Sequence, residues 1–192
     1  MRQTYYRTLA EIENLTRNLS IHGKNYPCFH CGGTTEWISH GFIYKNVGQK
    51  KVPIGKRIFC SNRNGHCGCG RTQRILSSLW SARIQVAVER ICLFLLALKT
   101  TSVSNAYRKI THSNSPRQAW RWLNKLKARM SDFKTVLCNQ KGRFEKSMLT
   151  DECSQKRTPL LQTFLSMETA YPQEHENPLS WFQVQSQQAV MG

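Results

Sequence analysis

The 192-residue chain has no long apolar run and few acidic residues. Its longest apolar run, Ile91–Leu98, is far shorter than the roughly 18 residues that a membrane span needs. Residues 1–20 mix Arg, Glu and Asn into every turn, which argues against a secretory signal peptide. These absences predict a cytoplasmic protein that has reduced cysteines and makes no contact with a membrane.

Acidic side chains number 11 against 28 Lys and Arg, and the imbalance is concentrated in the middle of the chain. Residues 24–143 hold 22 basic and 3 acidic side chains. Charge of this density repels itself unless a polyanion neutralises it, and phosphate backbones are the usual partner. The pattern therefore favours nucleic-acid binding over the alternative of a solvated basic surface.

Cysteines cluster in the first half of the basic region. The first two are separated by two residues and followed by Gly32 and Gly33, which let the backbone turn so that both thiolates point at one centre. A metal would supply the stability that such a short segment cannot gain from apolar burial. The spacing predicts a zinc ribbon, and the alternative is ordinary buried thiols or disulfides. The clustered cysteines are Cys28, Cys31, Cys60, Cys67 and Cys69.

Spacing alone leaves the fourth ligand open. Cys60 needs a partner, for which we favour Cys69 and keep Cys67 as the alternate, with His66 or His30 as weaker candidates. Four protein ligands leave no position for water, so the predicted Zn²⁺ is structural and not catalytic.

The predicted fold class is α+β, with a small zinc ribbon, a three-helix domain of helix-turn-helix type and a partly ordered C-terminal tail. Tyr5, Leu9, Ile12 and Leu15 recur at helical spacing and predict an amphipathic lead-in helix. The expected segments are residues 1–23 for this helix, 24–78 for the ribbon with strands at 34–39, 42–45 and 56–59, 79–140 for the helical domain, and 141–192 for a linker and tail that docks on the helical domain or on a partner.

The ribbon carries basic and aromatic side chains that suit nucleic acid. Trp37 and Tyr44 could stack on bases, or they could fill the thin core of the ribbon. The cations expected to contact phosphates are Lys45, Lys50, Lys51, Lys56 and Arg57.

Three helices are expected after the ribbon. Residues 82–99 have the apolar spacing of a core helix, and Ser102 or Ser104 can cap a short second helix. Residues 111–115 have turn composition, and Ser115-Pro116 then starts a third helix whose apolar stripe continues to Leu137. This order is that of a helix-turn-helix module.

One side of the third helix is polar, basic and almost free of acidic residues. Residues near the start of such a helix reach base edges, where Arg suits guanine and Gln or Asn suits adenine. Trp120 and Trp122 are expected to pack at the helix root, although Trp122 could also reach the backbone of a duplex. A solvated helical face is the alternative. The predicted base contacts are Arg117, Gln118 and Arg121, the predicted phosphate contacts are Lys125, Lys127 and Arg129, and Asn124 lies on the same side.

Four motifs together resemble a known family: Cys28-Phe-His-Cys31-Gly-Gly, His40-Gly41-Phe42, Phe59-Cys60 and Cys69-Gly-Arg-Thr72. They are similar to the zinc-ribbon head of bacterial insertion-sequence transposases and their small companion proteins. The resemblance covers roughly residues 26–135. It implies a helix-turn-helix that holds the ends of an element, and it supports Cys69 as the fourth ligand. The insert 61–68 is a departure, since the family usually has two residues there.

Full transposases of this kind add an acidic triad on a nuclease fold. After the helical module this chain has only six acidic residues, in a segment without a strand pattern, whereas two-metal chemistry needs carboxylates on a rigid sheet. We therefore expect a non-enzymatic, sequence-specific DNA-binding protein, an accessory or regulatory protein of a mobile element. The alternatives are a compact transposase or an RNA or protein adaptor. Expected partners are double-stranded DNA, a transposase or other mobile-element protein, and a second copy of the chain.

Overall fold

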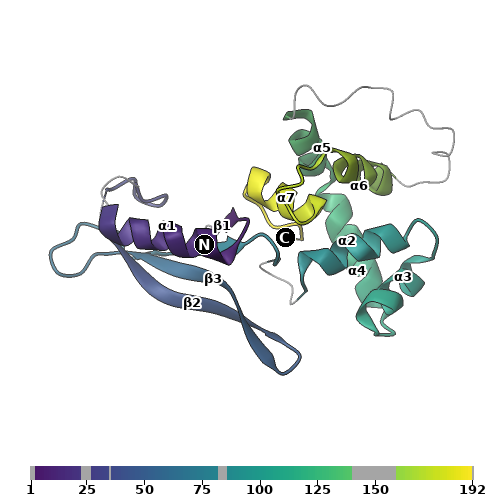
Figure 1. Cartoon of the computed structure of the whole chain (residues 1–192), viewed down its shortest axis with the longest axis horizontal. Helices are drawn as coiled ribbons and strands as arrows, with labels where there is room; N and C mark the ends of the chain where they lie inside the picture. The colour runs from purple at the N-terminus through teal and green to yellow at the C-terminus, as the bar shows by residue number, and fades with distance from the viewer. Residues whose placement is uncertain (1–2, 23–26, 35, 82–85, 140–158, 192) are drawn as a thin grey trace. The chain divides into compact units, whose positions relative to one another are not determined.

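The structure, a computed structural model, describes residues 3–22, 27–34, 36–81, 86–139 and 159–191. The chain divides into two compact units, Met1–Trp80 and Ser81–Gly192. The described residues form one four-stranded mixed sheet and seven helices, which confirms the predicted α+β class (Figure 1). The expected lead-in segment belongs to the first unit, and the expected tail belongs to the second.

The first unit is a sheet with one helix packed on it. The strands β1 (Gln3–Tyr6), β2 (Trp37–Val47), β3 (Lys50–Cys60) and β4 (Thr72–Ser77) lie in the order β1-β4-β3-β2. β1 pairs with β4 in parallel, and the other two pairings are antiparallel. Helix α1 (Leu9–His22) lies along the sheet in Figure 1, and its Ile12 is fully buried in a small core with Trp37, Ile58 and Ile75.

The predicted lead-in helix is wrong at its beginning. Residues 3–6 form the parallel edge strand β1, and α1 begins at Leu9. Tyr5, which was expected on the helix stripe, is a buried strand residue opposite Leu76. The alternation of a four-residue strand is too short to be told from helical spacing, so only the pairing with β4 reveals it.

β2 and β3 form a long hairpin, which extends past the rest of the sheet. The two short strands that were expected at 34–39 and 42–45 are one strand, because the register shifts between Ser39 and Phe42 and pairing then continues. Within β3, only residues 55–59 pair with β4. Residues 50–53 therefore pair with β2 alone, and the hairpin ends as a two-stranded ribbon around Gly48.

The second unit is helical and has one continuous apolar core. Phe94, Tyr107 and Trp122 join three of its helices through edge-to-face ring contacts, with centroids 5.2–6.5 Å apart. The helices are α2 (Val88–Ala97), α3 (Val103–Thr111), α4 (Pro116–Ala128), α5 (Met130–Asn139), α6 (Pro159–Ala170) and α7 (Pro178–Ser186).

Two helix boundaries differ from the prediction. The core helix expected at 82–99 spans only Val88–Ala97, and residues 82–85 lie outside the described residues. The third helix, expected to run unbroken to Leu137, ends at Ala128, and Arg129 has a non-helical φ of −97° and ψ of 3° before α5 begins. The unbroken apolar spacing hides this break, since neither Gly nor Pro marks it.

The C-terminal segment is not a loosely attached tail. α6 and α7 contribute to the main core, where Phe182 packs on Phe133 of α5 with ring centroids 4.6 Å apart. Val190 and Met191 are also fully buried. The expected linker 141–158 lies outside the described residues. No helix among the described residues has the length and apolar character to cross a membrane.

Candidate metal centre and basic faces

Four cysteine sulfur atoms of the first unit lie together and could hold a metal ion. All four Sγ atoms are within 4.8 Å of one another. Cys28 Sγ is 3.8 Å from Cys69 Sγ, and Cys31 Sγ is 4.0 Å from Cys60 Sγ. A tetrahedral ion with metal–sulfur bonds of about 2.3 Å requires sulfur atoms about 3.8 Å apart. The spacing of the four cysteines therefore fits one tetrahedral centre.

The first two ligands come from a tight backbone turn, here called the first knuckle (residues 28–33). The amide of Gly32 donates to the carbonyl of Cys28 over 2.7 Å, and the amide of Cys28 donates to the carbonyl of Gly33 over 2.9 Å. Gly32 has a φ of +70°, a conformation that favours glycine. The turn conformation expected behind the first cysteine pair is therefore found at Gly32, whereas Gly33 takes part through its carbonyl and has no positive φ.

The second knuckle (Cys60–Ser61 and Gly68–Gly70) has the same construction although its sequence is interrupted. The amide of Gly70 donates to the carbonyl of Cys60 over 3.1 Å, and Gly70 has the same φ of +70° as Gly32. The amide of Gly68 donates to the carbonyl of Ser61 over 2.7 Å, which closes off residues 62–67 as a separate loop. The insert is therefore a loop added to an otherwise ordinary knuckle.

This construction brings Cys69 into the cluster and leaves Cys67 outside it. Cys67 is exposed on the inserted loop. Of the weaker candidates, His66 Nε2 lies 2.7 Å from a carboxylate oxygen of Glu36, and His30 contributes its amide but not its ring to the cluster. The described cysteines form no disulfide, so the alternative of a disulfide framework is not realised among them.

Backbone amides stabilise negative charge on the sulfur atoms. The amide of His30 donates to Cys28 Sγ, and the amide of Cys69 donates to Cys60 Sγ, each over 3.4 Å. Burial raises the pKa of the Cys28 thiol, but hydrogen bonds from the His30 and Cys31 amides and from neighbouring thiols outweigh it and lower the pKa to about 7. Thiolates are the form that binds metal, so the site is prepared for a cation near neutral pH.

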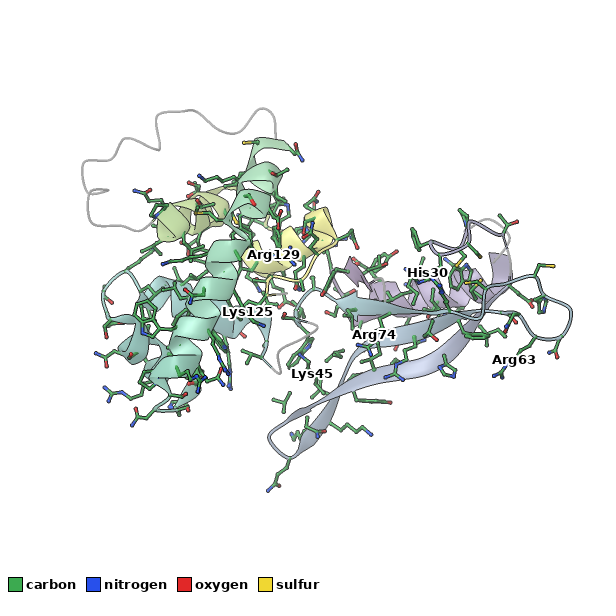
Figure 2. All side chains as sticks on the ribbon, turned by 180° about the vertical axis from the view of Figure 1, so that it is seen from behind. His30, Lys45, Arg63, Arg74, Lys125 and Arg129 are labelled. Carbon is green, nitrogen blue, oxygen red and sulfur yellow. The ribbon has the colours of Figure 1, made fainter. Side chains whose placement is uncertain are left out.

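A basic face without acidic residues lies on α4. The helix buries Ala119, Trp122, Leu123 and Leu126, and the remaining side faces solvent. Trp122 packs in the core as expected, whereas Trp120 is 50% exposed, so its predicted packing role is wrong. The exposed side chains of this α4 face are Arg117, Gln118, Trp120, Arg121, Asn124, Lys125 and Lys127, of which Figure 2 labels Lys125.

Arg129 differs from the other predicted contacts because its guanidinium is already bound within the chain. It forms an ion pair with Asp132 at 3.0 Å and donates to Gln188. Arg129 lies at the break between α4 and α5, so its position is explained by the helix junction rather than by the exposed face.

The cations of the hairpin lie beside aromatic rings. Lys51 Nζ is 4.9 Å from the ring centre of Tyr44, and Lys45 Nζ is 5.5 Å from that of Trp80. Burial lowers the pKa of Lys45 to about 8. Lys50 and Arg57 are exposed.

Only one of the two predicted stacking residues is available on the hairpin. Trp37 is 4% exposed and fills the core beside the metal centre, whereas Tyr44 is 46% exposed. Sequence reasoning missed Phe42, which is 38% exposed and lies 6.1 Å from Tyr44 between ring centres. Residues two apart in a strand share a face, so the predicted strand 42–45 already contained that signal.

The chain has no significant match to a protein-family model, to a curated protein or to a solved structure.

Proposed function

We propose that the protein binds double-stranded DNA and that α4 enters the major groove. The observation that carries this proposal is the exposed α4 face, which holds Arg, Lys, Gln and Asn side chains and no carboxylate. Arg and Gln occupy the first turn, where a recognition helix meets base edges. Arg117, Gln118 and Arg121 are assigned to bases, and Lys125 and Lys127 to phosphates.

The support beneath α4 suits this role. α3 is capped at its start by Ser102, whose hydroxyl accepts from the Asn105 amide, and it ends at Thr111, after which His112 has a left-handed conformation. α4 starts with Pro116, so the two helices are joined by a short turn. The ring contacts of Tyr107 and Trp122 fix one helix against the other. A rigid pair of this kind presents the exposed face at a defined angle, as a helix-turn-helix requires.

The four-cysteine centre is assigned to structural Zn²⁺. Four sulfur ligands at tetrahedral spacing favour Zn²⁺ or an iron–sulfur centre, and the CxxC-type knuckles resemble those of zinc ribbons. Bound zinc would hold the two knuckles together through Cys28, Cys31, Cys60 and Cys69. The chain would supply no open coordination position, so the metal would stabilise the first unit without performing chemistry.

The biological role that we assign is that of an accessory or regulatory protein of a mobile element, which binds DNA and does not cut it. The resemblance of the cysteine motifs to insertion-sequence transposases motivates this role. Terminal inverted repeats and a nuclease gene beside the coding sequence would support it. Nicking of a supercoiled plasmid carrying those repeats, by the purified protein with Mg²⁺, would replace it with the compact-transposase alternative.

DNA binding is tested with duplexes selected from a random pool by the intact protein. Arg121→Ala should weaken binding to a selected duplex about tenfold, because a bidentate contact to a base contributes roughly 1–3 kcal/mol. Lys134→Ala is the matched control, since it removes an exposed cation from α5 and leaves the α4 face intact. Zinc content should be unchanged in both. Equal affinities for Arg121→Ala and Lys134→Ala would refute the assignment of α4.

A further inference from the structure

The β2–β3 hairpin carries a surface that duplex binding by α4 does not use. We name it the aromatic strip and define it by Phe42, Tyr44, Lys51 and Lys56. Phe42 and Tyr44 are separated by one residue on β2, and their ring centres are 6.1 Å apart at an interplanar angle of 53°. Lys56 pairs with Phe42 across the two strands. One face of the hairpin therefore presents two neighbouring aromatic rings to solvent.

Each ring of the aromatic strip has a cation beside it. Lys51 Nζ lies 4.9 Å from the Tyr44 ring centre, and Lys56 Nζ lies 4.8 Å from the Phe42 ring centre. The rings are nevertheless 46% and 38% exposed. Neither Phe42 nor Tyr44 belongs to the apolar core of the first unit, so the exposed area of their rings contributes little to folding. The exposed rings are therefore better explained by a ligand than by folding.

Charge identifies the class of that ligand. Residues 37–60 contain no Asp or Glu, and their cations are Lys45, Lys50, Lys51, Lys56 and Arg57. A surface that sets exposed aromatic rings beside cations matches a strand of nucleic acid, in which bases alternate with phosphates. In a duplex the base faces are covered by their stacked neighbours, so exposed rings find their partners in unpaired bases.

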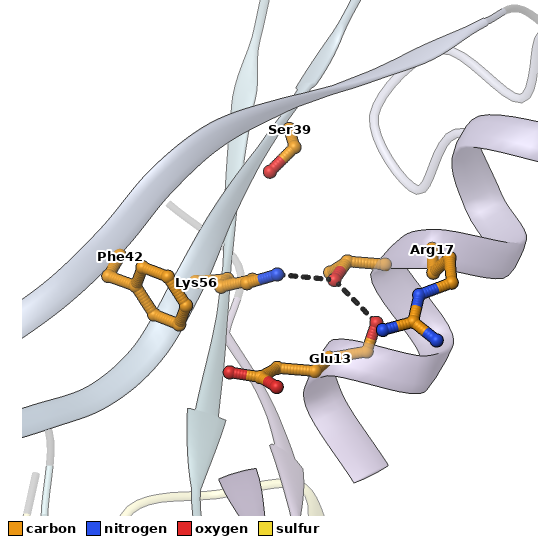
Figure 3. Close-up of a pocket in the computed structure, with 6 residues that line it drawn as sticks. Glu13, Arg17, Ser39, Phe42 and Lys56 are labelled. Carbon is orange, nitrogen blue, oxygen red and sulfur yellow. Dashed lines mark hydrogen bonds between the residues drawn. The ribbon is translucent and has the colours of Figure 1, made fainter. Parts of the chain in front are cut away.

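The strip continues into a cleft of about 360 Å³ between α1 and the hairpin. Its lining includes Phe42, Lys56 and Arg17, with Ser39 on β2 and Glu13 on α1 (Figure 3). The Lys56 ammonium is held in place by a 3.1 Å hydrogen bond to the Thr16 hydroxyl. Lys56 and Arg17 thus bring two cations to one cleft, and Glu13 is the acidic side chain in its lining.

We propose that the aromatic strip and its cleft bind single-stranded DNA. Unpaired bases stack on Tyr44 and Phe42, and the phosphates between them meet Lys51, Lys56 and Arg17. This site is in the first unit and uses no residue of α4, so it stands independently of the duplex-binding proposal. The protein would then hold a duplex and an unpaired strand through different surfaces.

The test measures binding of the full-length, zinc-loaded protein to fluorescein-labelled oligothymidine of about 12 nucleotides by fluorescence anisotropy. Tyr44→Leu should weaken the complex about tenfold, because it keeps an apolar side chain and removes the stacking face. Tyr44→Phe retains the ring and should bind as the parent protein does. Lys51→Gln should make the slope of log K against log salt concentration shallower by about 0.7. This change corresponds to one lost phosphate contact on a single strand.

Arg121→Ala provides the matched comparison. It should leave oligothymidine binding unchanged while weakening duplex binding, and Tyr44→Leu should show the reverse. The far-UV circular dichroism spectrum and the zinc content of each variant establish that it is folded. Oligothymidine that fails to bind, or that binds Tyr44→Leu and the parent equally, would overturn the proposal. Tighter binding of oligouridine than of oligothymidine would overturn the assignment to DNA and identify RNA as the ligand.

Discussion

The structure of the second knuckle predicts that residues 62–67 can be deleted without loss of the metal centre. The carbonyl of Ser61 and the amide of Gly68 are already joined by a 2.7 Å hydrogen bond, so a direct peptide link between these residues needs only a small backbone shift. The variant then has two residues between Cys60 and Cys69, as the first knuckle has between Cys28 and Cys31. We expect it to bind one metal ion per chain.

The expected change in metal affinity is small and can be worked from the structure. Shortening the intervening segment from residues 61–68 to two residues halves it twice, which lowers the entropy cost of closure by about 1.2 kcal/mol. The deletion also removes the polar contact between His66 and Glu36, whose side chains are 35% and 53% exposed; an exposed contact of this kind contributes at most about 1 kcal/mol. Zinc affinity should therefore stay within about tenfold of the parent value.

The assay is competition for Zn²⁺ with a chromophoric chelator at neutral pH, together with the metal content of the purified protein. Cys67→Ser is the matched control and should retain the metal, because Cys67 is outside the cluster. Cys69→Ser removes a ligand. If the 10–16 kcal/mol of structural zinc sites is shared among four sulfur ligands, this variant should lose on the order of 3 kcal/mol, or more than a hundredfold in affinity. Loss of metal from both the deletion variant and Cys67→Ser would refute the described coordination.

Two further predictions concern stability. Trp122→Ala should lower the free energy of unfolding of the second unit by about 3–5 kcal/mol in urea, because Trp122 is 6% exposed and contacts two other rings. Trp120→Ala, at a site that is 50% exposed, should lower it by less than about 0.5 kcal/mol. Equal losses in the two variants would contradict the described packing. The pKa of Lys45 is lowered from 10.5 to about 8, so between these values the unfolded chain keeps a proton that the folded chain has lost, and the stability of the first unit should rise with pH. Lys45→Met should reduce that rise in urea titrations at pH 8 and pH 10, and an unchanged rise would show that Lys45 does not contribute to it.

The metal ligands were the most predictable part of the structure, because a tight cysteine pair requires a local turn and little else. Gly32 and Gly70 each follow the last cysteine of a knuckle, and both have a φ of +70°. The spacing of the cysteines does not distinguish Cys67 from Cys69, because the loop 62–67 separates the two halves of the second knuckle in the sequence. The contact that decides the ligand is the hydrogen bond from the Gly68 amide to the Ser61 carbonyl, and no local sequence pattern predicts it.

Long-range pairing and tertiary packing account for the features that the sequence did not reveal. β1 becomes a strand only because β4, about 70 residues later, offers it a parallel edge. The division between α4 and α5 follows from the second set of partners, since Phe133 packs on Phe182 of α7. In both regions the local periodicity predicts which apolar positions are buried, but it does not predict which element packs on them.

The burial of Val190 and Met191 sets the time at which the second unit can form during synthesis. α4 has emerged long before these residues are translated, yet part of the core that supports it is still missing. A ribosome-bound chain therefore carries the basic face on an incomplete scaffold, and the unit closes only after translation has passed residue 191. A chain that ended within α6 would lack Phe182, the ring that covers Phe133 of α5, and would leave that apolar surface exposed.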